Sequence, residues 1–343
     1  MQAMLKELEL RKGELPGKEL QSVYFGGGTP SVLSQEELLS VFDAIAKDFS
    51  IAENAEVTLE ANPDDLTPEY LAMLKRTPVN RLSIGIQSFR ESDLRMMNRA
   101  HTVEEAEMVV KRAQDAGFTN LTVDLIYGIP GLSLEEWQQH LEKINALDVP
   151  HFSAYCLTVE PRTALAHLVK TGKVQPVDEE LASQHFYALA EFAAAQGFEH
   201  YEISNLAKPG FIAKHNSSYW FGEPYLGIGP SAHSFDGTTR RWNVANNAQY
   251  LRAIAAGEKT FEEEQLNPKE RFNEWVMTRL RTLWGLSPEE VMRQFGEEVF
   301  RELEKSARPW LLSGHLILAN GALVLTVKGR LMADRIASDL FLA

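Results

Sequence analysis

The chain has 343 residues, and its 34 Lys and Arg against 48 Asp and Glu give a formal net charge of −14. With 44% hydrophobic and 24% charged residues it has the composition of a globular protein, long enough for about two domains of ~100–200 residues. The single cysteine, Cys156, excludes an intramolecular disulfide framework, a zinc ribbon and an iron–sulfur cluster held by three or four cysteines of this chain.

The apolar segments are shorter than the roughly 20 residues that a membrane span needs, and residues 1–11 lack the basic-then-apolar order of a signal peptide. We therefore expect a cytoplasmic protein without stable membrane insertion. The acidic balance, without a long Lys/Arg cluster, argues against nucleic acid as a partner. The acidic run at 262–264 is predicted to be a solvated helix start or loop.

Short apolar, β-branched runs alternate with amphipathic stretches, at about the spacing of βαβ units. This alternation predicts an α/β fold built on a parallel sheet or barrel. The runs are at 23–25, 57–60, 82–87, 121–127 and 152–159, with a weaker one at 201–204.

Three capping boxes, each a Ser or Thr followed three residues later by Glu, predict helix starts between these runs. Each box precedes apolar residues whose spacing gives the helix one apolar face. Gly117 lies where a C′ glycine would end the second of these helices. The boxes are Ser34 with Glu37, Thr102 with Glu105, and Ser133 with Glu136.

The pattern changes twice along the chain, which predicts three parts: a barrel at 1–207, a connecting segment at 208–267 and a C-terminal domain at 268–343. The middle part is crowded with Gly, Pro, Asn and aromatic residues and is typical of an irregular, ligand-handling segment. The last part has helical periodicity and then two β-like runs joined by Asn320 and Gly321, as in a winged helix. Without a basic stripe, we interpret that domain as a structural or docking module rather than a DNA-binding one.

Polar residues follow the predicted strands at their carboxyl ends, where ligands bind in parallel sheets and barrels. A triple glycine at 26–28 allows backbone N–H groups to approach a ligand, although it matches neither a dinucleotide fingerprint nor a P-loop. Glu60, Gln87 and Asp124 lie in or at the end of later runs. The glycine run alone is as typical of a tight turn as of a ligand site, and each of the three polar residues alone is compatible with a structural cap. Together they predict a polar small-molecule site.

A second candidate site lies at 214–221, with the sequence Lys-His-Asn-Ser-Ser-Tyr-Trp-Phe. In a helix, His215 and Tyr219 would share one face. A neutral imidazole flanked by aromatic rings suits a planar, metal-bearing ligand such as heme. The alternative is a packed aromatic cluster around a hydrogen-bonded histidine. His101 is interpreted as a loop histidine beside a helix start.

Taken in order, several motifs resemble the radical SAM proteins related to oxygen-independent coproporphyrinogen III oxidase, most closely the heme chaperone (HemW) branch. The resemblance spans essentially the whole chain. It implies a partial (β/α)6 barrel that holds S-adenosylmethionine (SAM), followed by a small winged-helix-like C-terminal domain. The motifs are YFGGGTPS (24–31), EANP (60–63), GIQSF (85–89), NRAH (98–101), DLIYGIPG (124–131), HNSSYW (215–220) and GIGPSAH (227–233).

The resemblance also implies roles for individual residues. His215, Asn216 and Tyr219 would form a heme-binding motif, with His215 as the ligand of the heme iron. The residues implied for SAM are Gly27, Gly28 and Thr29 along its methionine moiety and Glu60, Gln87, Arg99 and Asp124 around the rest of the molecule.

The sequence departs from the family at its start. Radical SAM proteins carry Cys-x-x-x-Cys-x-x-Cys between their first strand and the following helix, and Met1 begins within what resembles that helix. We therefore expect a truncated or late-starting sequence in preference to a natural cluster-free paralogue, with a [4Fe-4S] cluster only in a full-length form. This chain is predicted not to cleave SAM, so no catalytic residue is assigned. Loss of the first strand would expose the strand at 23–25, which predicts reduced stability or a homodimer.

The leading functional hypothesis is a heme chaperone that binds heme and transfers it to an acceptor protein. The alternative is an oxygen-independent coproporphyrinogen III dehydrogenase of heme biosynthesis, which uses a 5′-deoxyadenosyl radical. A third hypothesis is a scaffold whose C-terminal domain docks a partner.

Overall fold

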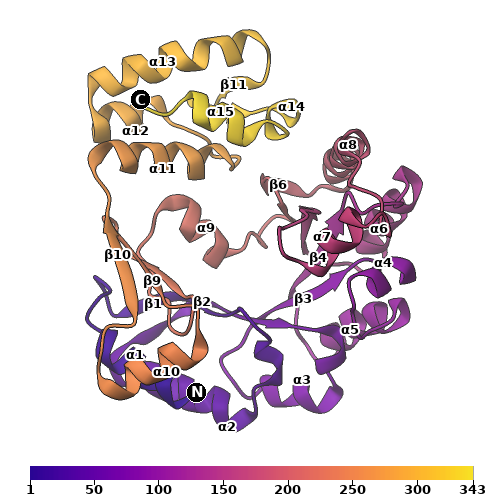
Figure 1. The fold of residues 1–343 in the computed structure, drawn as a ribbon, viewed down its shortest axis with the longest axis vertical. Coiled ribbons are helices and arrows are strands. Elements are labelled where there is room, and N and C mark those ends of the chain that lie inside the picture. Colours follow the sequence, from indigo (N-terminus) through magenta and orange to yellow (C-terminus); the bar gives the residue numbers. More distant parts are fainter. Residues whose placement is uncertain (343) are drawn as a thin grey trace. The chain divides into compact units, whose positions relative to one another are not determined.

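The computed structural model describes residues 1–342, which form two compact units built from non-contiguous segments (Figure 1). One unit comprises Met1–Val23, Leu33–Glu56 and Lys214–Ala343, and the other comprises Tyr24–Val32 and Val57–Ala213. The predicted division at residues 207 and 267 stays a prediction.

A curled sheet of seven strands has the order β1-β2-β3-β4-β5-β7-β6, with β1 at one edge (Figure 1). Strands β2 to β5 pair in parallel, which confirms the predicted α/β fold with a partial barrel. The strands are β1 (Glu19–Phe25), β2 (Ser50–Ala61), β3 (Arg81–Gln87), β4 (Asn120–Tyr127), β5 (His151–Cys156), β6 (Glu199–Glu202) and β7 (Asn205–Ala207).

The sheet departs from the prediction at its far edge. The run at 201–204 is the centre of a hairpin in which β7 pairs antiparallel with both β5 and β6. A parallel partner needs a crossover connection of about a dozen residues or more, and the link between β6 and β7 is far shorter. Strand β5 ends at Cys156, before the predicted end at residue 159.

The three helix starts predicted between the strands are confirmed. All three capping boxes form, with both reciprocal hydrogen bonds present, at the starts of α2, α5 and α6. Gly117 follows α5 with φ +86°, so it is the C′ glycine that was expected. The helices and short 3-10 turns up to residue 196 are α1 (Gln2–Arg11), η1 (Pro30–Val32), α2 (Gln35–Asp48), η2 (Pro63–Asp65), α3 (Pro68–Leu74), α4 (Glu91–Met96), α5 (Val103–Asp115), α6 (Leu134–Ala146), α7 (Ala164–Lys170) and α8 (Glu179–Gln196).

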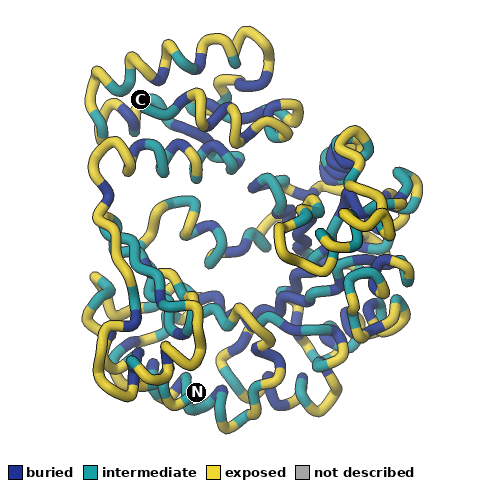
Figure 2. Tube along the Cα trace, in the orientation of Figure 1, coloured by how far each residue is buried: buried dark blue, intermediate teal, exposed yellow. Residues whose placement is uncertain are grey.

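The central strands and the helices that cover them form the core of the second unit (Figure 2). Ile84 of β3, Val123 of β4 and Phe152 of β5 are fully buried, as is Trp137 of α6. Burying such side chains stabilises the fold by about 1.5–3 kcal/mol each. This rigid core fixes the carboxyl ends of the strands, where the predicted polar site lies.

A second sheet corrects one prediction. The run at 262–264 lies on strand β10, not at a helix start or in a loop, and it is exposed as expected. Glu263 and Glu264 lie opposite Arg241 and Arg240 of β9, and these opposite charges favour the pairing of a strand that has few apolar residues. The elements of this region are α9 (Lys214–Phe221), β8 (His233–Phe235), β9 (Thr239–Asn243), α10 (Asn247–Ala256) and β10 (Phe261–Gln265).

The last region is largely helical and carries the expected hairpin. Asn320 and Gly321 join its two strands with φ +49° and +78°, the left-handed pair that a two-residue hairpin turn requires. The elements are α11 (Pro268–Leu280), α12 (Pro288–Phe295), α13 (Glu297–Leu312), β11 (Leu316–Ala319), β12 (Ala322–Leu325), α14 (Val327–Arg330) and α15 (Ala333–Asp339).

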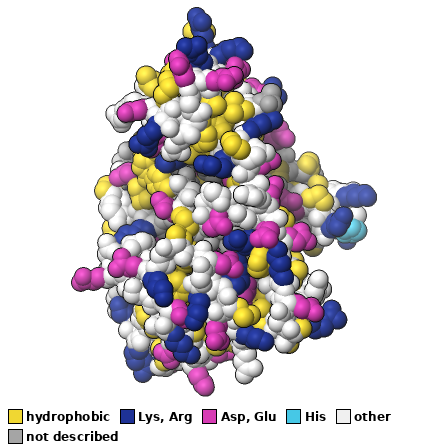
Figure 3. All heavy atoms as spheres, turned by 90° about the vertical axis from the view of Figure 1, so that its left-hand side faces the viewer, with side chains coloured by type: hydrophobic (Ala, Val, Ile, Leu, Met, Phe, Trp, Pro, Cys, Tyr) yellow, Lys and Arg dark blue, Asp and Glu magenta, His cyan; other side chains and the backbone are white. Residues whose placement is uncertain are grey.

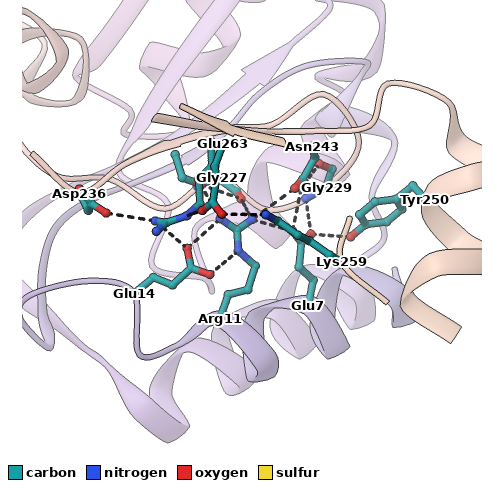
Figure 4. A network of polar contacts seen from close by, with 12 residues as sticks. Glu7, Arg11, Glu14, Gly227, Gly229, Asp236, Asn243, Tyr250, Lys259 and Glu263 are labelled. Carbon is teal, nitrogen blue, oxygen red and sulfur yellow. Dashed lines mark hydrogen bonds and ion pairs between the residues drawn. The ribbon is translucent and has the colours of Figure 1, made fainter. Parts of the chain in front are cut away.

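A buried carboxylate joins α1 to segments more than 200 residues away in the sequence (Figure 4). Glu7 accepts hydrogen bonds from Nη1 of Arg11 (2.8 Å), Nδ2 of Asn243 (2.7 Å), N of Gly229 (2.8 Å) and the hydroxyl of Tyr250 (2.6 Å). These four donors satisfy both oxygens of a charge that would otherwise be costly to bury.

On the face shown in Figure 3, Lys and Arg side chains are intermixed with Asp and Glu. Among residues 1–342, no helix is long and apolar enough to cross a membrane.

Candidate functional site

Glu60 brings the glycine loop to the end of β2. Its Oε2 accepts a hydrogen bond from the backbone N of Gly27 (3.0 Å), and its Oε1 accepts one from the hydroxyl of Tyr24 (2.7 Å). A Cβ on Gly26 would lie 2.4 Å from the Tyr24 ring, so only glycine fits there. The structure thus brings together Gly27 and Glu60, two of the residues predicted to bind SAM.

The rest of the loop is open. Gly27 and Gly28 have φ +74° and +65°, a left-handed conformation that favours glycine, and nothing lies within 4 Å of where their Cβ atoms would be. Thr29 is exposed next to them. Gly28 and Thr29 are therefore accessible to a ligand.

Asp124 of β4 lies in the same polar cluster as Glu60. Burial raises the pKa of Asp124 to about 6, the hydroxyls of Ser153 and Ser83 oppose this rise, and the Glu60 carboxylate adds to it. Burial also raises the pKa of Tyr155 to about 12, with a further contribution from Asp124. The cluster therefore holds two carboxyls that a cationic ligand can neutralise.

Arg99 and Gln87 converge on Gly85 of β3. Nη2 of Arg99 donates to the carbonyl of Gly85 (2.6 Å) and to Oδ1 of Asn62 (2.9 Å). Gln87 has φ +74°, an uncommon conformation for a residue with a side chain. A Cβ on Gly85 would lie 2.9 Å from Nε2 of Gln87 and 3.4 Å from Nη2 of Arg99. His101 is buried just before the N-cap of α5, with Nε2 3.2 Å from the carbonyl of Ile86.

The second predicted site is helix α9. A buried carboxylate accepts hydrogen bonds from the N-terminus of this helix. Glu56 of β2 accepts hydrogen bonds from the backbone N of Lys214 (2.9 Å) and of His215 (3.0 Å). The negative charge satisfies two N–H groups that have no partner within the helix, and it complements the positive end of the helix dipole. The backbone of His215 is thereby fixed.

Both ring nitrogens of His215 have partners. Nδ1 lies 2.8 Å from Oγ of Ser22, and Nε2 lies 2.8 Å from the hydroxyl of Tyr219. Burial lowers the pKa of His215 to about 4 although Glu56 opposes this shift, so the imidazole is neutral near pH 7. The predicted shared helix face is confirmed, and the hydrogen-bonded histidine of the alternative interpretation is present as well. Asn216 is half-buried beside His215.

Three residues of these sites were not singled out from the sequence. Ser22 and Tyr24 lie on β1, and Glu56 lies on β2 just before the predicted run. Tyr24 is the first residue of the motif at 24–31, and this motif is the sequence signal that could have identified it. Ser22 and Glu56 act on residues about 160 to 190 positions away, which no local pattern reveals.

The residues do not fit a [4Fe-4S] cluster. Cys156 is the one cysteine in these 343 residues, and three thiolates are needed. Within the described residues 1–342, no group of three or more His, Cys, Asp or Glu is placed to hold a metal ion.

Known proteins match the chain along nearly its whole length. Residues 3–144 match the Radical SAM superfamily, and residues 266–332 match the HemN C-terminal domain. The heme chaperone HemW of Mycobacterium tuberculosis is 34% identical over 339 residues, which cover 98% of this chain and 85% of that protein. The chain belongs to the HemW family. The heme chaperone HemW of Bacillus subtilis is 32% identical, over 93% of this chain and 84% of that protein.

A solved structure agrees with this assignment at the level of the fold. Coproporphyrinogen III oxidase (HemN) from Escherichia coli, a radical SAM enzyme, superposes with a TM-score of 0.84 at 22% identity, covering 99% of this chain and 82% of that one. SAM and a [4Fe-4S] cluster are features of the superfamily to which HemW proteins belong. In this HemW-family chain the residues predicted for SAM lie in the unit with Val57–Ala213, and those predicted for heme lie in the unit with Lys214–Ala343.

Proposed function

We propose that this chain binds heme on the face of α9 that carries His215 and Tyr219 and transfers it to an acceptor protein. The observation that carries the proposal is a neutral imidazole, held at Nδ1 by Ser22, on a helix whose N-terminus Glu56 fixes. Neutral imidazole is the form that ligates iron, and a partner at the other ring nitrogen sets its orientation. The names of the HemW relatives support the same function.

When bound, heme would supply an iron that accepts a nitrogen ligand, together with a flat apolar surface. His215 offers a nitrogen to the iron, and the rings of Tyr219 and Tyr225, whose centroids are 4.6 Å apart, offer an aromatic wall. A site with one histidine on an eight-residue helix suits a carrier that releases its ligand. The acceptor would be a second protein that takes up the released heme.

We also propose that the cluster around Glu60 and Asp124 binds SAM. SAM carries a sulfonium, an ammonium and a carboxylate. Carboxyls of Glu60 and Asp124 complement the cations, and Arg99 is a natural partner for a carboxylate. Because the chain supplies one cysteine, we propose that it does not cleave SAM as it stands. The alternative function, oxidation of coproporphyrinogen III, requires that cleavage.

A heme titration followed by the Soret band tests the heme site. The matched variants are His215→Ala and, as a control, His167→Ala, which removes an exposed histidine of α7. We expect a saturable shift in the wild type and in His167→Ala, and its loss in His215→Ala. A shift that is the same in all three proteins would contradict the assignment of His215, and no saturable shift in the wild type would favour the scaffold function.

Transfer is tested by mixing the heme-loaded protein with apomyoglobin as a probe acceptor. We expect the Soret band of holomyoglobin to appear within minutes. Retention of heme through repeated additions of apomyoglobin would contradict the carrier function.

A further inference from the structure

We propose that the strand face next to α9 completes the ligand site, and that Arg240 of β9 binds a carboxylate at the edge of the ligand. This inference rests on the proposed heme function and adds to it a specific anchor. It assigns the ligand class as a planar metalloporphyrin with free carboxylates.

A row of side chains crosses the strands toward Arg240. Tyr225 and Phe235 exchange backbone hydrogen bonds of 2.8 and 2.9 Å in an antiparallel bridge, and Phe235 lies opposite Arg240 in the register of β8 and β9. Directly opposed residues of antiparallel strands project to the same face. Tyr225, Phe235 and Arg240 therefore share one face of the sheet.

This row continues to the predicted iron ligand. The rings of Tyr219 and Tyr225 meet edge to face at 4.6 Å, and the hydroxyl of Tyr219 lies 2.8 Å from Nε2 of His215. Arg240 is close enough to Tyr225 to oppose the rise that burial causes in the pKa of that phenol. An imidazole, an aromatic wall and a guanidinium thus follow one another along one surface.

The neighbouring residue, Arg241, differs from Arg240 in its ion-pair partners. Arg241 lies on the opposite face, where Asp236 (3.2 Å), Glu263 (3.1 Å) and Glu14 (3.5 Å) surround its guanidinium. Arg240 lies opposite Glu264 of β10 and forms an ion pair with Glu274 of α11, and 38% of its side chain stays exposed. A guanidinium has five N–H donors, so Arg240 can bind a second carboxylate beside that of Glu274.

The order of these groups matches the chemistry of heme. Its iron lies at the centre, its aromatic surface extends outward, and its propionates lie at the rim. Guanidinium binds carboxylates through paired, charge-assisted hydrogen bonds, which are stronger than neutral ones. A porphyrin whose carboxylates are esterified would keep the iron and the aromatic surface but lose the contact with Arg240.

The test compares hemin with hemin dimethyl ester in Soret titrations of the whole chain. The variants are Arg240→Gln, Glu274→Gln, which breaks the same ion pair from the other side, and Arg252→Gln, which removes an exposed arginine of α10. We expect Arg240→Gln to weaken hemin binding about tenfold or more, as loss of a charge-assisted hydrogen bond implies, and to leave ester binding unchanged. Glu274→Gln and Arg252→Gln should bind hemin at least as tightly as the wild type.

Other results would contradict the proposed contact between Arg240 and a carboxylate of the ligand. Equal weakening by Arg240→Gln and Glu274→Gln would show that the ion pair is only structural, and equal loss for hemin and its ester would show that Arg240 acts through the fold. Unchanged hemin binding in Arg240→Gln would exclude the contact while leaving the proposed function standing. A wild type that binds neither ligand would instead overturn the proposed function together with the anchor.

Discussion

The hydroxyl of Tyr219 lies 2.8 Å from Nε2 of His215, on the side of the imidazole away from Ser22. Burial raises the pKa of Tyr219 to about 12, so its phenol is protonated near pH 7 and can donate. In the tautomer whose Nδ1 donates to Ser22, Nε2 accepts from Tyr219, and this is also the nitrogen that can bind iron. A heme iron bound by His215 would therefore compete with the Tyr219 hydroxyl for the same lone pair.

This competition predicts the effect of Tyr219→Phe. The variant keeps the ring against Tyr225 but removes the competing hydroxyl, and such a hydrogen bond contributes about 0.5–1.5 kcal/mol. We expect hemin to bind up to about tenfold more tightly, as measured by Soret titration. Tyr219→Ala is the control, since it removes the aromatic wall as well and should weaken binding. Weaker binding by Tyr219→Phe would mean that the hydroxyl itself contributes to the site.

Gly85→Ala should damage the proposed SAM site. The new Cβ would lie 2.9 Å from Nε2 of Gln87 and 3.4 Å from Nη2 of Arg99, so both side chains must move. We expect calorimetry to show a several-fold loss of SAM affinity. Gly13→Ala is the matched control, because nothing lies within 4 Å of its Cβ position. Unchanged affinity in Gly85→Ala would remove Gln87 and Arg99 from the site.

Local signals predicted most of the fold. The capping boxes, the C′ glycine at 117 and the Asn320–Gly321 turn each depend on residues within a few positions, and all of them form. The buried parallel strands were recognisable because their apolar runs are continuous. The sequence could not show that 262–264 lies on a strand, since that depends on Arg240 and Arg241 across the pair.

Local sequence patterns likewise indicate only some of the residues in the candidate sites. Motif residues such as Glu60 and Arg99 stand in recognisable local patterns, and the structure places each against a backbone group of its own cluster. Ser22 and Glu56 carry no such pattern, because their effect on His215 arises only when strands β1 and β2 meet α9. The orientation of a histidine ring is a tertiary property, because distant residues hold its nitrogens.

Glu7→Gln tests the buried network of Figure 4. The carboxylate accepts hydrogen bonds from four donors, on Arg11, Asn243, Gly229 and Tyr250. In the glutamine variant the amide NH₂ group would face some of these donors and could not accept from them. Arg11 would also lose the negative charge of its buried partner. We expect a loss of about 2–4 kcal/mol in the free energy of unfolding, measured with urea. Glu9→Gln, an exposed position on the same helix, should change stability little. A loss no greater than that of the control would show that the network tolerates a neutral side chain.

His140 should make the protein sensitive to acid. It lies on α6 and is buried against the rings of Phe89 and Trp137. Burial lowers its pKa from 6.5 to about 4, and of the smaller contributions the Asp93 carboxylate opposes this shift while the Arg90 guanidinium adds to it. Between pH 6.5 and 4, His140 is therefore protonated more readily in the unfolded chain than in the folded one. The stability that is fully present above pH 6.5 is lost as the pH falls toward 4.

The magnitude follows from the size of that shift. At about pH 5 the unfavourable protonation of His140 should cost about 2 kcal/mol relative to about pH 7.5. His140→Leu removes this contribution, so the free energy of unfolding in urea should fall less on acidification by that amount. Other histidines have a lowered pKa as well, among them His151 and His215, and Asp124 has a raised one with the opposite acid dependence. These contributions stay in both proteins and cancel in the difference. An equal fall in both proteins would mean that His140 is protonated without cost, and the acid sensitivity would then be assigned to the other histidines whose pKa burial lowers, such as His151 and His215.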